Sequence, residues 1–378
     1  MAVTTIRPRL DDSAHSSLRI LTHALPAPSN EGFAFPTIIS EVQSPLSPER
    51  TTWISHWHAV SGRFNLSQLP TTPPTTPAPP HEGEDYFTTK VFDSAVAVPD
   101  YQSMETGRPK LPGSVPSITT PRPAVQPSTV HISITERYIP PASATEFINL
   151  FDPASGRSLL SDRLVELSDR SGMLTFVYPT REGGRTFLRH YLGKCLDPLL
   201  RKMMIVRQLD ADVCQRIGDM RAVASMPTYD ELKARMQAYC NQITTSTGQN
   251  TTIGNKFKGK TGGRVQYSLV YSTRNNVVLA PEVWSDWWCR QEKPRIRDTF
   301  DTWIRNHPNR DRAASAASAN KPVNYRTRLR DDPSEGGSMS YILEVLEGVK
   351  RSAPEKAREL EPVGIEIGVF VIKKQGVQ

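Results

Sequence analysis

A short apolar run, two glycines and a helix pattern follow one another between residues 173 and 187, and this is the place in the sequence best suited to binding an anion. MLTFVY (173–178) predicts a strand covered on both faces, because nearly every residue is apolar. YPTREGGRTF (178–187) then opens a helix, and the first N–H groups of a helix attract anions. The candidate anion site comprises Arg181, Gly183, Gly184 and Arg185.

This junction supports two hypotheses. Open α/β sheets bind phosphate- and nucleotide-bearing ligands where a strand ends and a helix begins, so one hypothesis is an enzyme of Rossmann-like build with such a ligand at residues 178–187. Neither G-x-G-x-x-G nor GxxxxGK[ST] occurs in the chain. In the other hypothesis the two glycines only let the helix start close to the sheet.

Other catalytic signatures are absent from the sequence. There is no G-x-S-x-G motif, and no Ser-His-Asp or Cys-His arrangement follows from the spacings, so we predict no catalytic residue. The four cysteines, at positions 195, 214, 240 and 289, match no metal or redox motif. We therefore predict no metal, no cofactor, and thiols that stay reduced inside a cell.

Positive charge is concentrated in residues 250–330. This basic block holds 16 Lys and Arg against 6 Asp and Glu, a net charge of +10 in a chain whose total is +7. Its cations lie in a loop with lysines and glycines and beside tryptophans, which is the combination that phosphate contact and base stacking need. The candidate residues for binding nucleic acid or an acidic partner are Lys256, Lys258, Lys260, Arg264, Arg290, Lys293, Arg295 and Arg297.

The basic block also has less specific interpretations. Trp284, Trp288, Phe300 and Trp303 recur at helical spacing, which is typical of a core and not of base stacking. The cations would then form a solvated face or pair with an acidic protein. Nucleic acid, an acidic protein and no specific partner thus stay open as alternatives.

The first third of the chain is rich in proline. Residues 1–128 hold 19 of the 32 prolines, which resist both helix and sheet, so we predict that this region is largely disordered. Its apolar islands, at 19–25, 33–39, 53–66 and 85–98, are expected either to dock onto the folded part or to bind protein partners. Four Ser/Thr-Pro pairs make candidate phosphorylation sites of Ser44, Ser47, Thr72 and Thr76.

The rest of the chain alternates strand and helix patterns. VHISITERYI, which starts near residue 130, predicts a half-buried strand, and the capping box at 228–231 predicts a helix. Residues 264–281 predict two strands about a central turn, and the apolar run at 364–374 predicts a strand that completes the sheet. The predicted fold class is α/β, a single mixed-sheet, three-layer-like domain after a largely disordered Pro/Ser/Thr-rich third.

These patterns divide the chain into four segments. They are a Pro-rich region with docking islands (1–128), an α/β domain (129–307), a basic Ala/Ser linker (308–339), and a helix and strand that complete the domain (340–378).

On sequence alone we favour a non-enzymatic regulatory or adaptor protein of a eukaryotic cell. It would contact nucleic acid or an acidic partner through the basic block and be regulated by phosphorylation of its Ser/Thr-Pro pairs. The alternatives are the Rossmann-like enzyme and a protein-only scaffold. No signal core opens the sequence and no apolar run reaches the about 18 residues of a membrane span, so we expect an intracellular protein, nuclear rather than cytoplasmic, with no membrane partner.

Overall fold

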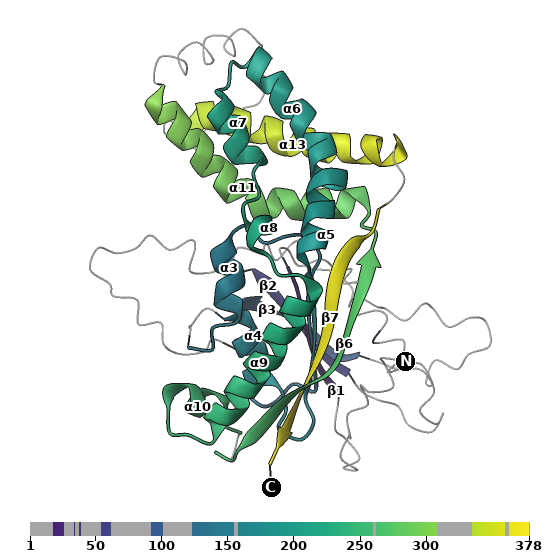
Figure 1. The fold of residues 1–378 in the computed structure, drawn as a ribbon, viewed down its shortest axis with the longest axis vertical. Helices are drawn as coiled ribbons and strands as arrows, with labels where there is room; N and C mark the ends of the chain where they lie inside the picture. Colours follow the sequence, from purple (N-terminus) through teal and green to yellow (C-terminus); the bar gives the residue numbers. More distant parts are fainter. Residues whose placement is uncertain are drawn as a thin grey trace, which may run out of the picture.

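The computed structural model describes residues 18–25, 34, 38, 54–61, 92–100, 123–154, 158–259, 262–307, 335–359 and 363–377. Within these residues the chain forms a sheet flanked by helices, and a further group of helices stands at one end of that sheet (Figure 1). The strands come from both the proline-rich third and the rest of the chain.

The described residues build one mixed sheet of seven strands. These are β1 (Leu18–Leu25), β2 (Ile54–Ser61), β3 (Phe92–Asp100), β4 (Ile132–Arg137), β5 (Met173–Pro179), β6 (Val265–Val277) and β7 (Ile365–Gly376). Their order is β3-β2-β1-β4-β5-β7-β6. Strands β1 to β5 run parallel, whereas β7 runs antiparallel to both β5 and β6. The last strand of the chain therefore lies inside the sheet.

Helices flank the sheet and extend beyond it. Those nearer the sheet are α3 (Ala144–Leu150), α4 (Leu159–Glu166), α5 (Arg181–Thr186), the π-helical turn η5 (Phe187–Leu192), α8 (Ala222–Ser225), α9 (Tyr229–Thr247) and α10 (Thr252–Phe257). The helices that pack on one another at one end of the molecule, here called the helical lobe, are α6 (Gly193–Val206), α7 (Ala211–Gly218), α11 (Pro281–Asn306) and α13 (Glu335–Glu359) (Figure 1). In the described part of the chain, no helix is long and apolar enough to cross a membrane.

Helix α9 begins at the capping box that the sequence contains at residues 228–231. The side chain of Thr228 accepts the amide N–H of Glu231, and the carboxylate of Glu231 accepts the amide N–H of Thr228 at 2.8 Å. Both amides would otherwise lack a partner at the helix start. The helix predicted from this capping box is confirmed.

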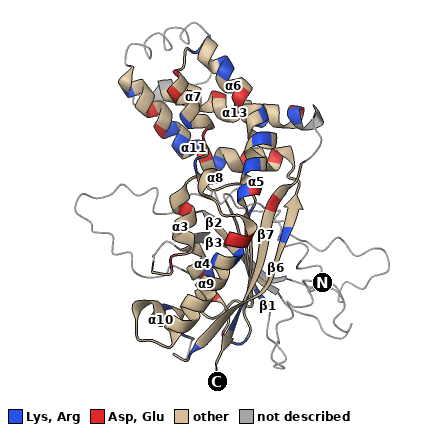
Figure 2. Ribbon diagram, in the orientation of Figure 1, with Lys and Arg blue, Asp and Glu red and all other residues tan. Residues whose placement is uncertain are grey.

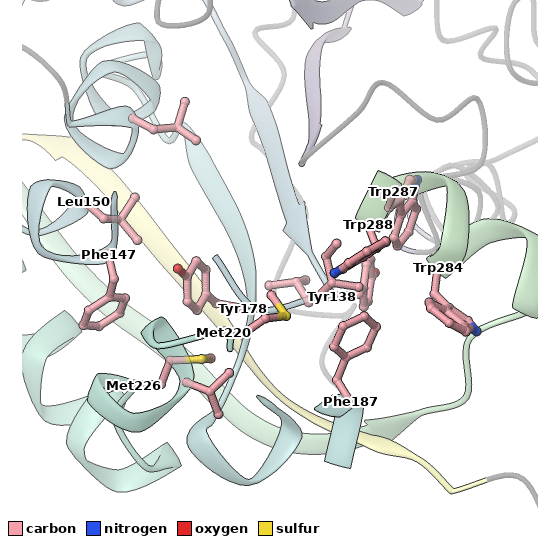
Figure 3. Packing of buried hydrophobic residues seen from close by; sticks show 14 of the residues in the cluster. Tyr138, Phe147, Leu150, Tyr178, Phe187, Met220, Met226, Trp284, Trp287 and Trp288 are labelled. Atoms are coloured by element: carbon pink, nitrogen blue, oxygen red, sulfur yellow. The ribbon is translucent and has the colours of Figure 1, made fainter. Parts of the chain in front are cut away.

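The apolar core covers the sheet and continues into the helical lobe. One cluster joins strands β1, β4, β5 and β7 through Leu18, Ile20, Ile132, Ile134, Met173 and Val371. A larger cluster includes the aromatic residues of α11, all of them buried, namely Trp284, Trp287, Trp288, Phe300 and Trp303. Figure 3 shows the three neighbouring tryptophans beside Tyr138 and Phe187. The interpretation of these residues as core is confirmed.

Strands β1, β2 and β3 come from the proline-rich third. They overlap the apolar islands at 19–25, 53–66 and 85–98, so the described residues of these three islands belong to the folded part. Since β1 lies between β2 and β4, residues before position 129 supply three adjacent strands on one side of the central strand β4. The α/β fold class is confirmed, but the sheet begins well before the predicted domain boundary, which otherwise stays a prediction.

The prediction of two strands between 264 and 281 is wrong. One long strand, β6, pairs with β7 along its length, and Asn275 and Asn276 take part in the pairing. A two-residue hairpin needs positive φ at both central residues, which an Asn-Gly pair adopts most readily. Here no glycine follows the asparagines, so a tight turn is disfavoured. The chain instead continues as one strand paired with β7. The predicted C-terminal strand is confirmed as β7.

Candidate functional site

The sheet reverses its direction of growth between β1 and β4. The chain adds β2 and β3 on one side of β1, then crosses back and adds β4 and β5 on the other. Such a topological switch point leaves a crevice outside the carboxyl ends of the two central strands, and open α/β sheets bind their ligands there. These strand ends face the helical lobe (Figure 1).

Polar side chains gather at the carboxyl ends of the two central strands. β4 ends in the buried polar residues Thr135, Glu136 and Arg137, and β1 carries the buried Thr22 and His23 just before its last two residues, Ala24 and Leu25. Burying a polar group costs free energy unless it is hydrogen-bonded. Polar residues at this edge mark a candidate site because of where they lie, at the switch point, and not because buried polar groups are confined to it: Asp162, Arg163, Glu166 and Lys374 are buried elsewhere in the fold.

Glu136 is an oriented hydrogen-bond acceptor. Its Oε2 accepts the phenol O–H of Tyr138 at 2.6 Å and the backbone N–H of Ala34 at 3.1 Å. Burial, and then the neighbouring Glu136 carboxylate, raise the pKa of Tyr138 above its usual value, so the phenol keeps its proton and donates. The Tyr138 ring stacks on Trp287 of α11, with ring centroids 5.9 Å apart. The carboxylate is thereby held against the helical lobe.

Arg137 ties the end of β4 to two helices. Its Nε donates to the carbonyl oxygen of Ile139 at 3.0 Å, and its two terminal nitrogens bond Glu146 of α3 and Gln291 of α11. Gln291 Nε2 in turn donates to the carbonyl oxygen of Pro140 at 2.9 Å. A planar guanidinium can hold several acceptors in fixed directions. This network therefore sets the position of the lobe over the edge of the sheet.

The hydroxyl groups of Thr22 and Thr135 also lie near the carboxyl ends of the two central strands. Thr22 Oγ1 and His56 Nε2 share a hydrogen bond of 2.8 Å between β1 and β2. In the described structure Thr135 Oγ1 is buried with no hydrogen-bond partner. A buried hydroxyl without a partner has lost its bonds to water and gained none. A polar ligand group that reached Thr135 would restore that bond.

The glycines of the predicted anion site are packed against protein. Thr180 accepts the N–H of Gly183 through its hydroxyl at 3.2 Å and the N–H of Gly184 through its carbonyl at 2.8 Å. A Cβ on Gly183 would overlap the carbonyl oxygen of Glu366, and one on Gly184 would lie 3.1 Å from the sulfur of Met226. These contacts fit the structural hypothesis, in which the glycines let α5 start against β7.

The arginines of the same site bond protein acceptors. Arg181 donates through Nε to the carbonyl oxygen of Met226 at 2.6 Å and through Nη2 to Glu231 at 3.1 Å. Arg185 pairs with Glu182 at 2.8 Å. The donors expected to meet an anion are thus engaged within the fold, and the switch point becomes the stronger candidate for a ligand site.

The basic block is divided between distant parts of the fold. Lys256, Lys258 and Arg264 lie on or near α10 and the start of β6, away from the lobe, whereas the remaining described candidates lie on α11 in the lobe, namely Arg290, Lys293, Arg295 and Arg297 (Figure 2). The two groups do not form one binding face. Lys260 and the candidate phosphorylation residues Ser44, Ser47, Thr72 and Thr76 lie outside the described residues.

Several cations of the basic block have partners within the chain. Lys258 donates to the side chain of Asn250 at 2.9 Å, and Arg290 pairs with Asp286 at 2.6 Å. Arg295 bonds Glu292 and also donates to the carbonyl oxygen of Ile217 at 2.9 Å. Arg295 therefore serves to join α11 to α7.

Solved structures resemble the chain over most of its length. Loganic acid methyltransferase with SAH has 10% sequence identity and a TM-score of 0.47, covering 99% of this chain and 91% of that one. The YcgJ protein from Bacillus subtilis has 8% identity and a TM-score of 0.29, covering 100% and 97%. The cyclopropane synthase MmaA2 from Mycobacterium tuberculosis has 9% identity and a TM-score of 0.24, covering 96% and 79%. No protein-family model and no curated protein matches the sequence.

At these identities the likeness concerns the fold alone. The strand order of the sheet is itself Rossmann-like. It follows the doubly wound pattern through β5 and departs from it where the antiparallel β7 enters between β5 and β6.

The hypothesis of a non-enzymatic regulatory or adaptor protein is wrong. It rested on a single basic block, which the fold divides, and on islands in a disordered third, of which three are strands of the sheet. The chain instead builds a Rossmann-like sheet with a switch point, where open α/β sheets bind ligands. The alternative of a Rossmann-like enzyme fits better. The nuclear location and the phosphorylation stay predictions.

The residues at the switch point were not singled out from the sequence. A signal was present in VHISITERYI, where the alternation of apolar and polar residues gives way to Thr135, Glu136 and Arg137. Thr22 and His23 sit in an island that we interpreted as a docking motif. Only the order of the strands brings the two groups together.

Proposed function

We propose that the chain is a Rossmann-like enzyme that binds an adenosine-bearing ligand at the carboxyl ends of β1 and β4. The observation that carries the proposal is the cluster of buried polar side chains at the switch point of the sheet. Ligands of open α/β sheets bind at this place. Thr135, whose buried hydroxyl has no partner among the described residues, lies in the same cluster.

The sequence after β1 favours a ligand without a pyrophosphate. Residues 26–40 contain a single glycine, Gly32. Dinucleotide binding relies on three glycines between the first strand and its helix, which let the backbone approach the phosphates closely. S-adenosylhomocysteine, named with one of the similar structures, carries adenosine and no phosphate. We therefore take S-adenosyl compounds as the ligand class.

The residues present fit such a ligand. A carboxylate has about four acceptor positions, so Glu136 can accept from ribose hydroxyls in addition to Tyr138 and Ala34. The hydroxyl of Thr135 can donate to or accept from a polar ligand atom. Arg137, through Gln291, holds α11 over the strand ends. When bound, an S-adenosyl sulfonium would supply an activated methyl group.

Calorimetric titration of the full-length protein tests this function. S-adenosylhomocysteine is expected to bind, whereas NAD⁺ and ATP bind weakly or not at all. Glu136→Gln should weaken the binding about tenfold, because the uncharged amide oxygen accepts a weaker hydrogen bond than the carboxylate does. Tighter binding of NAD⁺ would contradict the phosphate-free ligand class, and no binding of any of the three would contradict the site.

Two threonines provide a matched pair of variants. Thr135 and Thr175 are buried in adjacent strands, and neither hydroxyl has a partner in the described structure. Thr175 pairs with Ile134 and lies four positions before the end of β5, so it is farther from the carboxyl edge of the sheet than Thr135, which lies two positions before the end of β4. Thr135→Val should weaken S-adenosylhomocysteine binding about fivefold, whereas Thr175→Val should leave it unchanged. Equal effects of the two variants would count against a contact with Thr135.

A further inference from the structure

The last turn of α6 exposes consecutive apolar side chains. Met204, Ile205 and Val206, here called the apolar tip, are 38%, 80% and 63% exposed. Single exposed hydrophobic residues are ordinary on protein surfaces. A run of three at the end of a helix is not, unless it serves a function.

The position of the apolar tip follows from how α6 packs. Its buried stripe, made of Cys195, Leu196, Leu200 and Met203, ends at the residue before the tip. The last turn therefore extends past the helices that cover the stripe, at the end of the lobe far from the sheet (Figure 1). Just beyond it, Gln208 has a φ of 52°, in the left-handed region that residues other than glycine seldom adopt. The chain turns back sharply there, and the tip projects.

Cations stand on both sides of the apolar tip. Arg201 and Lys202 precede it and are exposed, and Arg207 follows it. Arg207 pairs with Glu344 of α13 at 3.0 Å, and its guanidinium lies 5.9 Å from the ring centre of Tyr341. Arg207 is thus fixed beside the tip, while Arg201 and Lys202 extend into solvent.

We propose that the apolar tip binds the surface of an anionic membrane. Ile205 and Val206 would enter the boundary between headgroups and acyl chains, and Arg201 and Lys202 would meet anionic headgroups. A second copy of the chain fits less well, because a symmetric contact would bring the same cations together. The expectation of no membrane partner rested on the absence of a spanning segment, which a contact at the membrane surface does not need. The proposal is independent of the ligand at the switch point.

Cosedimentation of the full-length protein with vesicles tests the proposal. We expect binding to vesicles of phosphatidylcholine with phosphatidylserine and little binding to phosphatidylcholine alone. Replacing both Ile205→Ser and Val206→Ser should lower the partition coefficient about tenfold or more. Replacing both Arg201→Glu and Lys202→Glu should lower it by a similar factor and reduce its dependence on salt.

Ile148 supplies the matched control. It is 61% exposed, stands on α3 outside the lobe, and has Glu146 two positions before it instead of flanking cations. Ile148→Ser should leave vesicle binding unchanged, which separates a specific contact from general surface hydrophobicity. Thermal unfolding and S-adenosylhomocysteine titration of each variant show whether the fold and the other site are intact.

Three results would overturn the proposal. The first is wild-type protein that stays in solution with anionic vesicles. The second is vesicle binding that survives the replacement of Ile205 and Val206, or that falls equally with Ile148→Ser. The third is a wild-type dimer that the tip variant converts to a monomer without any change in vesicle binding, since the tip would then be an interface between copies of this chain.

Discussion

Gly183 of α5 lies against the backbone carbonyl of Glu366 in β7, so closely that a methyl group on its Cα would overlap the carbonyl oxygen. The same carbonyl accepts the amide N–H of Thr180 at 3.1 Å, and the Thr180 hydroxyl donates to the Glu366 carboxylate at 2.6 Å. The end of β5 and the start of α5 are thereby joined to the last strand of the chain. This contact explains why position 183 requires a glycine.

Replacing Gly183 by alanine should destabilise the fold by about 3 kcal/mol, because the added methyl group meets backbone that cannot move without breaking the bonds of Thr180. Urea-induced unfolding measures the effect. Gly218→Ala is the control, since a Cβ there would lie 3.6 Å from Leu200, an ordinary contact, within a helix. That variant should be neutral or slightly stabilised. Equal stability of the two variants would show that α5 and β7 are not packed as described.

Part of the fold could be predicted from local patterns. β5 and β7 are apolar runs long enough to be recognised, and the capping box at 228–231 placed α9. The strands β1, β2 and β3 could not be recognised from the sequence, because each is a short apolar run between proline-rich stretches. Their parallel pairing joins residues far apart in the chain, such as Ile20 with Ile132. The residues around one strand do not indicate which distant segment of the chain it pairs with.

The candidate site was predicted less well, for the same reason. The sequence showed two glycines between a strand and a helix, but not that β7 would pass over them. It also showed Glu136 and Arg137 at the end of a strand pattern, but their meaning depends on β1 lying next to β4. A switch point is a property of strand order, which no single motif contains.

Lys374 should be required for stability. Its ammonium group is buried and donates to the carbonyl oxygen of Leu167 at 2.7 Å and to the carboxylate of Asp169 at 2.8 Å. Lys374→Met leaves both acceptors without this donor and should cost about 3 kcal/mol of unfolding free energy. Lys373→Met, the same change on the other face of the strand and at a half-buried position, should cost less than about 1 kcal/mol. Similar costs, measured by urea unfolding, would contradict the buried role of Lys374.

Arg137 should not be replaceable by lysine. The guanidinium reaches Ile139, Glu146 and Gln291 at once, and a single ammonium group cannot span these directions. Arg137→Lys should lower the unfolding free energy by about 2 kcal/mol. It should also speed hydrogen exchange in α11, which loses its bond to β4. Arg290→Lys, at an exposed pair with Asp286, is expected to change stability by less than about 0.5 kcal/mol. Unchanged exchange in α11 would rule out the proposed tie between sheet and lobe.

Glu166 should make stability depend on pH. The side chain is fully buried, and burial raises its pKa from 4.5 to about 7, with a further contribution from the charge of Asp162. The nearby Arg163 and the backbone N–H groups of Ala124 and Val125 act in the opposite direction without cancelling the shift. Between pH 4.5 and about 7 the folded carboxyl group therefore holds a proton that the unfolded chain has released. Raising the pH through this window removes that proton and destabilises the fold.

The contribution of Glu166 can be isolated by difference. Glu166→Gln keeps an oxygen acceptor for Ala124 but cannot titrate, so other groups cancel when the unfolding free energies of the two proteins are subtracted at each pH. The wild-type advantage should fall as the pH rises, by about 1.4 kcal/mol per pH unit in the middle of the window, and level off above about 7. A difference that is flat across this window, or that rises with pH, would mean that the folded carboxyl group is ionised throughout and that Arg163 compensates its burial.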